Sequence, residues 1–202
     1  MSTLTLNAIT DQVTLPPPHV SPTGTLRHAL QHRHSSRAFA RTALSPETLS
    51  ALLWAGFGIN RPATGHRTAP SAHNWQEIEI FVALANGTYR YDPVPHGLTL
   101  VKAEDLRGAT GTQDFVATAP VNLVYVAHFN RMHEATGDER AFLAGADAAF
   151  IAQNINLFCA NAGLATVVRG LIQRHHLAIA LGLSHHERIV LAQSVGLPAA
   201  PG

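Results

Sequence analysis

Residues 32–37 of the 202-residue sequence could bind a phosphate group. The run His-Arg-His-Ser-Ser-Arg combines two guanidinium groups with neutral hydroxyl donors. Arginine forms paired, charge-assisted hydrogen bonds to phosphate, and serine adds a neutral donor, so this composition favours a phosphate monoester. A solvated basic turn has the same composition, and the segment alone does not separate the two readings. The candidate phosphate-site residues are Arg33, His34, Ser35 and Arg37.

A second segment, residues 69–76, carries the hydroxyl and amide groups that suit a flat heterocycle. Asn74 and Gln76 each offer a donor and an acceptor, which match alternating N–H and C=O groups on a ring edge. A loop that caps the following strand would have a similar composition. His73 lies in the same loop and could donate a proton as an electron acceptor is reduced, although a solvated loop histidine fits equally.

Two further places concentrate polar groups in unusual surroundings. Asp147 lies in a helix rich in alanine, where it must be satisfied within the core, across an interface or by a ligand. The predicted strand that begins at Leu164 ends in Arg169-Gly170, and glycine lets a flat molecule approach the backbone closely.

Familiar motifs of other site classes are absent from the sequence. We find neither a G-x-x-x-x-G-K-[ST] phosphate loop nor a G-x-S-x-G nucleophile elbow. His28 and His32 could share a helix face, but the sequence places no third ligand beside them. We therefore predict that the protein holds no metal ion.

The composition limits the class of protein. Charged residues make up only 13% of the chain and the net charge is +1, so a nucleic-acid binder with a basic face is excluded. One cysteine, no apolar run of about eighteen residues and no secretory signal predict a cytoplasmic protein outside the membrane. The low charge also indicates that an oligomer interface covers part of the surface.

The pattern of helices and strands predicts a single α+β domain over residues 25–202, preceded by an extended arm, residues 1–24, without a core face. We expect helices from Thr25, from Pro46 to Gly56, from Asp138 to Ala162 and over residues 175–183. We expect strands over residues 78–82, 89–91, 98–101, 121–127, 164–168 and 187–195, and a loop over residues 60–74. The continuous apolar run 121–127 predicts a strand that is buried on both faces.

Five elements in this order resemble the FMN-dependent nitroreductase superfamily, in its shorter branch. Residues 33–39 resemble its R-x-S-x-R-x-F opening, and residues 44–55 resemble its second helix. Residues 67–76 resemble the P-S-x-x-N-x-Q loop, residues 116–121 the V-x-x-A-P-V entry to the central strand, and residues 147–170 the long helix and the strand beyond it.

The resemblance implies a mainly antiparallel central sheet flanked by helices, in an intertwined homodimer with two FMN molecules at the subunit interface. It implies that Arg33 and Ser35 hold the phosphate, and that Arg37 lies toward the N1/O2 edge of the flavin. Residues of the second loop would approach the flavin from the partner subunit; they are Pro70, Ser71, Ala72 and Asn74. Backbone at Val168, Arg169 and Gly170 would pass near the ring, and Gln113 would face the site or pack beside it.

The implied activity is reduction of a nitroaromatic or quinone acceptor by NAD(P)H in a ping-pong hydride mechanism. Two alternatives remain open: a flavin-dependent dehydrogenase of a bound substrate, of the azoline-oxidase type, and a flavin carrier without turnover. Longer members of the family have a basic pair near the C-terminus that this sequence lacks, and Arg61, Arg67 or Arg174 could replace it.

Overall fold

The centre of the fold is one antiparallel sheet of seven strands. The computed structural model describes residues 11–20 and 24–200, and within them the strand order is β1-β6-β5-β4-β7-β9-β8. Every neighbouring pair in this sheet is antiparallel, as the resemblance implies. The strands are β1 (Gln12–Thr14), β4 (Ile78–Leu84), β5 (Gly87–Asp92), β6 (Gly97–Lys102), β7 (Val121–His128), β8 (Ala165–Arg169) and β9 (Glu187–Gly196).

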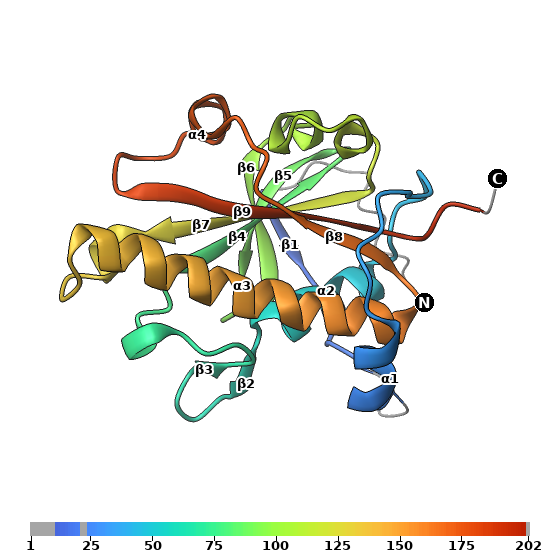
Figure 1. Cartoon of the computed structure of the whole chain (residues 1–202), viewed down its shortest axis with the longest axis horizontal. Helices are drawn as coiled ribbons and strands as arrows, with labels where there is room; N and C mark the ends of the chain where they lie inside the picture. The colour runs from blue at the N-terminus through green and yellow to red at the C-terminus, as the bar shows by residue number, and fades with distance from the viewer. Residues whose placement is uncertain (1–10, 21–23, 201–202) are drawn as a thin grey trace.

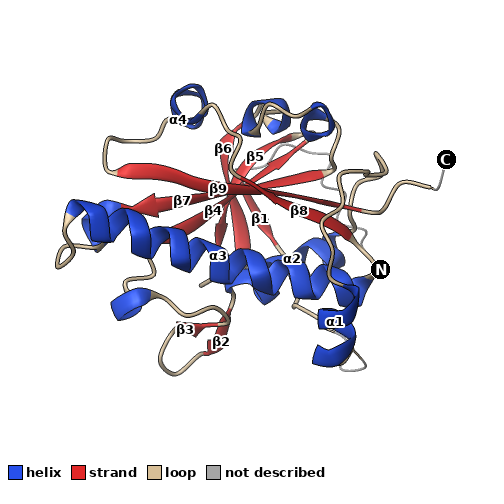
Figure 2. Cartoon of the chain, viewed as in Figure 1, coloured by secondary structure: helices blue, strands red, loops and turns tan. Residues whose placement is uncertain are grey.

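Helices cover both faces of the sheet (Figures 1 and 2). On one face lie α2 (Pro46–Phe57) and α3 (Gly137–Ala162), with α1 (Leu26–His32) beside the C-terminal end of α3. The other face carries α4 (Arg174–Leu181) and the short turns η2 (Arg107–Thr110) and η3 (Asp114–Ala117). Each face has its own apolar core, and the larger one lies beneath α2 and α3. This arrangement confirms the predicted α+β class.

The two helices of the larger face begin and end where the sequence predicts. The Ser45 hydroxyl accepts the Thr48 N–H at 3.2 Å, and Pro46 occupies the first position of α2, where its missing N–H costs nothing. Thr136 and Glu139 form a reciprocal capping box at the start of α3. Gly163 ends α3 at a φ of 67°, a left-handed conformation that glycine adopts without strain.

Strand β7 lies between β4 and β9, near the middle of the sheet. Its first seven residues, 121–127, are all buried because helices or turns cover both faces. The predicted strand with two buried faces is therefore confirmed.

The N-terminal arm differs from the prediction of a segment without a core face. Strand β1 pairs with β6, and Val13 and Leu15 are buried in the larger core. Ser50 on α2 donates to the carbonyl of Pro16 at 2.6 Å and also contacts His96 at 2.7 Å. The sequence pattern did not predict β1, because two apolar residues give only a weak strand signal in a segment rich in proline. Residues 1–10 and 21–23 of the predicted arm lie outside the described residues.

The predicted loop over residues 60–74 contains a small hairpin. Strands β2 (Ile59–Arg61) and β3 (His66–Arg67) pair with each other outside the main sheet, and the turn η1 (Ala72–Asn74) follows. The prolines and glycine of this segment lie in the turn and flanks of the hairpin, which concealed its two short strands.

Helix α3 leaves one side uncovered. Its buried residues, such as Ala148 and Ile151, face the sheet, while Phe142 and Phe150 are exposed on the outer side. The helix is long and apolar enough to cross a membrane by length and composition, but the core helix of a globular protein meets the same criterion. The helix packs against α2 and against strands β8 and β9, as the core helix of a globular protein does.

Candidate functional site

The predicted phosphate segment, residues 32–37, and the residues that follow it as far as Ala40 are held along the end of the sheet. The Ser36 N–H donates to the carbonyl of Thr166 on β8 at 2.9 Å. Farther along, the Ala40 N–H donates to the carbonyl of Leu197, and Phe39 forms a β-bridge with Pro198. These contacts fix the segment beside the strand that ends in Arg169.

The side chains of Arg33, Ser35 and Arg37 are exposed and available to a ligand. Within the described residues, no hydrogen bond or ion pair reaches any of these three side chains. The Nδ1 atom of His34 is 2.8 Å from the carbonyl oxygen of His32. The structure therefore leaves two guanidiniums and one hydroxyl of this segment exposed and without partners, whereas His34 contacts the neighbouring backbone.

The end of β8 exposes backbone while its arginine side chain is buried. Arg169 is only 4% exposed, and its guanidinium donates to the carbonyl of Thr110 at 2.8 Å, to Ser194 and to Asn122. Burial lowers the pKa of Arg169 to about 10. The predicted contribution of Val168, Arg169 and Gly170 through their backbone stays a prediction; the Arg169 side chain points into the protein instead.

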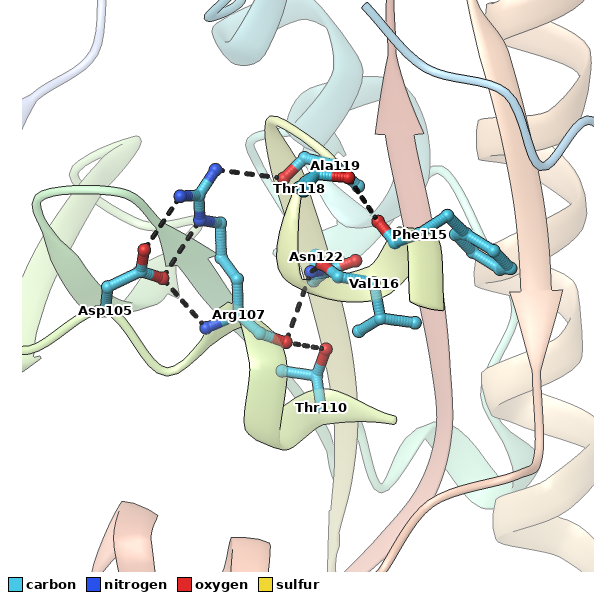
Figure 3. Close-up of polar contacts among 8 residues, drawn as sticks. All are labelled: Asp105, Arg107, Thr110, Phe115, Val116, Thr118, Ala119 and Asn122. Carbon is cyan, nitrogen blue, oxygen red and sulfur yellow. Dashed lines mark hydrogen bonds and ion pairs between the residues drawn. The ribbon is translucent and has the colours of Figure 1, made fainter. Parts of the chain in front are cut away.

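The loop that carries Gln113 is held against the sheet by a polar cluster shown in Figure 3. Arg107 pairs with Asp105 at 2.7 Å and donates to the carbonyl of Ala119 at 3.2 Å. Asn122 on β7 donates to the carbonyl of Val116 at 2.8 Å. The cluster fixes η2 and η3 on either side of Gln113.

Gln113 precedes a residue that packs near the phosphate segment. The ring of Phe115, two residues after Gln113, is 5.7 Å from the ring of Phe39, two residues beyond Arg37. The Oε1 atom of Gln113 is buried and has no hydrogen-bond partner among the described residues. An unpaired buried acceptor beside a predicted ligand site is consistent with Gln113 facing that site.

The second predicted segment is a loop of unusual backbone conformation. His73, Asn74 and Gln76 all have φ values near 50°, in the left-handed region that non-glycine residues rarely adopt. Such conformations persist only where the surrounding structure imposes them, and they cluster at functional sites. Pro70, His73 and Asn74 are exposed, while Ser71 and Ala72 are half-buried.

Two buried carboxyl groups hold this loop from below. The Ser71 hydroxyl donates to Glu77 Oε2 at 3.1 Å and accepts the N–H of Gln76 at 2.8 Å. The N–H of Ala72 donates to Asp147 Oδ2 on α3 at 2.8 Å. The Asp147 carboxylate therefore has a hydrogen-bond partner within the chain, which is one of the alternatives that the sequence left open.

Glu77 has a strongly perturbed acidity. Burial, followed by the charge of Asp147, raises the pKa of Glu77 to about 7, against the opposing hydrogen bond from Ser71. Sequence reasoning did not single out Glu77. The signal in the sequence was an acidic residue directly before the apolar run of β4. The burial of its side chain became evident only in the structure.

His73 lies on the exposed side of the loop. Its ring stacks on Trp75 with centroids 4.5 Å apart, and Nδ1 is 3.8 Å from a carboxylate oxygen of Glu134. The position leaves the ring accessible to a bound molecule. Its predicted role as a proton donor stays a prediction.

The two groups of predicted site residues lie at different places along α3. The loop 70–76 is attached to Asp147, whereas α1, which leads into Arg33, lies beside Asn161. Asp147 and Asn161 are fourteen residues apart in the helix, which corresponds to about 21 Å. Within one chain, therefore, the two groups of predicted site residues are attached to different parts of α3.

A groove of about 1220 Å³ lies between these helices, and sequence reasoning did not predict it. Its walls come from α1, α2 and the C-terminal half of α3, with Trp54, Leu157 and Phe158 among them. The groove depends on how three helices pack, so no local sequence pattern could reveal it.

A separate ionic cluster lies near the start of β4, at Glu79. The Nε2 atom of His128 is 3.1 Å from Glu79 and 3.3 Å from Glu187. Although burial opposes ionisation, the hydrogen bond and charge of His128, together with those of Arg131, lower the pKa of Glu79 to about 2. The spacing of Glu79, His128 and Glu187 would admit a metal ion, but Arg131 already pairs with Glu79 at 2.7 Å. The prediction of no metal stays a prediction.

The three arginines considered as replacements for C-terminal basic residues all have partners elsewhere. Arg61 donates to the carbonyl of Arg67 in the β2–β3 hairpin, and Arg67 donates to Gln76. Arg174 donates to the carbonyls of Ile189 and Val190 on β9. Within one chain, these contacts do not place any of the three beside Arg33.

Comparison with known proteins gives a consistent result. The profile of the Nitroreductase family matches residues 30–197. A curated protein of Methanocaldococcus jannaschii, provisionally named a nitroreductase, is 30% identical over 155 residues, which are 72% of this chain and 78% of that protein. A crystal structure from Ralstonia eutropha, also provisionally named a nitroreductase, is 43% identical with a TM-score of 0.91, and the match covers 95% of this chain and 91% of that one.

Two further solved structures share the fold at lower identity. One, from Desulfovibrio desulfuricans, is a provisionally named nitroreductase in complex with FMN; it is 22% identical with a TM-score of 0.64, covering 88% of both chains. The other is the Escherichia coli microcin synthetase McbBCD complex with truncated pro-MccB17 bound. The match to it is 19% identical with a TM-score of 0.72, covering 85% of this chain and 73% of that one.

Proposed function

This chain belongs to the nitroreductase family, and from that premise we propose that it is an FMN-dependent oxidoreductase that acts as a homodimer. Its substrates in this proposal are NAD(P)H and a flat, electron-poor acceptor of the nitroaromatic or quinone type. The observation that carries the proposal is the set of free donors on residues 33–37. The side chains of Arg33, Ser35 and Arg37 are exposed and have no partners among the described residues, and their segment is held beside β8 through Ser36.

The residues present fit FMN. The phosphate of FMN is a dianion near neutral pH, and two guanidiniums with a hydroxyl supply the charge and the hydrogen bonds that it needs. Arg33 and Ser35 would hold the phosphate, and Arg37 would lie toward the polar edge of the ring. The buried, unpaired Oε1 of Gln113 would accept a hydrogen bond from the ligand.

The chemistry that FMN supplies when bound is transfer of a hydride from NAD(P)H to the acceptor in two half-reactions. The protein's contribution is binding and orientation. The loop of residues 70–74, supported by Glu77 and Asp147, would cover the site from the partner subunit, and His73 would be placed to deliver a proton to the reduced acceptor.

The placement of the two groups of residues supports a homodimer. In one chain the loop 70–76 is attached to Asp147 and α1 lies beside Asn161, two positions about 21 Å apart along α3, so a second copy would complete the site. The exposed Phe142 and Phe150 on α3 supply an apolar surface for a second copy. The FMN bound to the related Desulfovibrio protein supports the cofactor assignment.

The proposal is tested by adding FMN to purified protein and then NADPH without oxygen. We expect bound flavin, which loses its absorption near 450 nm when NADPH is added. Arg33→Ala and Arg37→Ala should each raise the FMN dissociation constant by about tenfold or more, because each removes a charge-assisted hydrogen bond. Arg41→Ala, an exposed arginine outside the predicted site, is the matched control and should bind normally.

The outcomes separate the candidate functions. Protein that binds no FMN contradicts the proposal, and flavin that binds but does not bleach indicates the carrier without turnover. A flavin-dependent dehydrogenase of a bound substrate is the second candidate, favoured by the fold shared with the microcin synthetase complex at a TM-score of 0.72. Oxygen-dependent turnover that ignores NAD(P)H would favour this second candidate.

A further inference from the structure

Two buried carboxyl groups hold adjacent residues of the loop 70–76, because Glu77 accepts from Ser71 and Asp147 accepts from Ala72. Glu77 is fully buried and Asp147 is 3% exposed. Glu77 comes from the start of β4 and Asp147 from the middle of α3, so the pair joins the sheet to the helix. Within the described residues, no lysine, arginine or histidine forms an ion pair with either side chain. Two negative charges bonded to adjacent residues of one loop in a buried place repel each other, because no described cation pairs with either of them.

The hydrogen bonds around the pair lack one donor. Oε2 of Glu77 accepts from the Ser71 hydroxyl, and Oδ2 of Asp147 accepts from the Ala72 N–H. Oε1 of Glu77 is buried and receives no hydrogen bond from any described residue. A carboxylic acid carries its own O–H donor, so one proton on Glu77 would remove the repulsion and would let the unpaired oxygen donate a hydrogen bond to a neighbouring carboxylate.

We propose that Glu77 and Asp147 share one proton and that this acid–carboxylate pair is a positioning device for the loop of Ser71 and Ala72. The proposal deepens the function proposed above and rests on it where the flavin is concerned. In this state Glu77 receives the Ser71 hydroxyl and donates to Asp147, which in turn receives the Ala72 N–H. Both residues of the loop that face the flavin are thereby fixed from below.

Loss of the shared proton would disturb the loop directly. Two adjacent carboxylates would separate, and the loop is bonded to both of them. Ser71 also closes the loop by accepting the N–H of Gln76, one of the residues with left-handed backbone. A small shift of Glu77 therefore moves the strained part of the loop as well.

The other charged groups near the loop act on different atoms. Arg67 on β3 and Arg131 after β7 both bond to Gln76, and His73 pairs with Glu134 on the exposed side. The charged group that faces Glu77 is Asp147 on α3. The ionisation of Glu77 can therefore be followed separately from changes at the exposed side of the loop.

The shared proton can be measured on the protein without flavin. In wild-type protein with glutamate labelled by ¹³C at the carboxyl carbon, the Glu77 signal should titrate near neutral pH and disappear in Glu77→Gln. Asp147→Asn should return the Glu77 titration toward the ordinary range, because the neighbouring charge is gone. A Glu77 signal that is ionised across the whole range from about pH 5 to about pH 9 would overturn the proposal.

The effect on the loop is measured as the FMN dissociation constant against pH. In the wild type this constant should rise as the pH increases above the pKa of Glu77, by up to about tenfold per pH unit, since one proton is linked to binding. Glu77→Gln should bind FMN well throughout, because an amide donates to Asp147 and accepts from Ser71 as the protonated acid does. The flavin phosphate titrates near pH 6 in both proteins, so comparison of the two removes that contribution.

Controls keep the outcomes distinct. Glu104→Gln changes an exposed acid on the surface and should retain the wild-type pH profile. Equal loss of affinity at every pH in Glu77→Gln would show a merely structural role and overturn the positioning claim. If neither protein binds FMN at any pH, the proposed function fails, while the carboxyl titration without flavin still decides whether the proton is shared.

Discussion

At the scale of single residues, Arg169 shows how a predicted site residue can have a structural side chain. Its guanidinium is surrounded by neutral acceptors, the carbonyl of Thr110 and the side chains of Asn122 and Ser194. Among the described residues no carboxylate pairs with it, and burial lowers its pKa. Oriented dipoles of these neutral groups stabilise its charge. Its hydrogen bonds connect β8 with β9 and with the turn η2, behind the predicted flavin site.

Replacing Arg169 should destabilise the protein strongly. Arg169→Met removes the charged donor of this buried network and leaves the Thr110 carbonyl and the Asn122 oxygen without its hydrogen bonds, which we expect to cost about 3 kcal/mol. Urea denaturation followed by circular dichroism measures the change. Arg41→Met, an exposed arginine, should stay within about 0.5 kcal/mol of the wild type, and an equally small effect of Arg169→Met would contradict the network's role.

At the scale of elements, the N-terminal arm depends on a chain of hydrogen bonds through a buried serine. The Ser50 hydroxyl donates to the Pro16 carbonyl, His96 Nε2 contacts that hydroxyl, and Tyr91 contacts His96 Nδ1 at 2.9 Å. The chain connects the arm to α2 and to the β5–β6 turn. It explains why residues that read as an exposed arm form strand β1.

The attachment of the arm should weaken in acid. Burial lowers the pKa of His96 below its ordinary value, against the effect of a backbone hydrogen bond at Pro16. Because the folded pKa is the lower one, the stabilisation is present above the unfolded pKa of about 6.5 and is lost as the pH falls through the folded pKa. Amide hydrogen exchange at Val13 should therefore accelerate relative to the sheet centre as the pH falls below about 6, after correction for intrinsic rates.

Ser50→Ala is the matched test of the same chain of bonds. It leaves the Pro16 carbonyl without its donor and should destabilise the protein by about 1–2 kcal/mol, with faster exchange at Val13 already at neutral pH. Ser184→Ala, an exposed serine, serves as the control. Unchanged exchange at Val13 in Ser50→Ala would show that pairing of β1 with β6 alone holds the arm.

At the scale of the whole molecule, the separated halves of the site and the uncovered side of α3 both require a second copy in our proposal. Phe150 is 48% exposed in the middle of α3, near small residues such as Ala146 and Ala149. Small side chains let two helices approach closely, and a phenylalanine at their edge adds apolar area. The low content of charge over the chain is consistent with this covered surface.

Placing a charge on this surface should separate the subunits. Phe150→Glu would bury an unpaired carboxylate in the proposed interface, so we expect a monomeric mass by light scattering and loss of FMN binding in the same variant. Ile179→Glu changes an exposed apolar residue of α4, on the opposite face of the sheet, and should leave both properties intact. A dimeric Phe150→Glu protein would exclude this side of α3 as the interface.

How well the sequence predicts a feature of the structure depends on how far apart along the chain the interacting residues lie. Capping at Ser45 and Gly163, helical spacing in α2 and α3 and the apolar run of β7 are local signals, and each predicted element is present near its expected bounds. The donors on residues 33–37 were predictable because they are adjacent in the chain. The β1 strand and the β2–β3 hairpin were missed because two or three residues give too short a pattern among prolines and glycines.

By itself, then, the amino-acid sequence determined the α+β class through periodicity and the family through motifs along the chain. The resemblance to that family implied the antiparallel sheet and the residue types of the proposed flavin site. Only the tertiary structure decided that Glu77 meets Asp147, that the Arg169 side chain turns inward, and that the two halves of the site lie apart along α3. Glu77 and Asp147 are separated by seventy residues of sequence, and the acidity of a carboxyl group depends on what surrounds it in space. The spacing of residues along the chain therefore does not predict that environment.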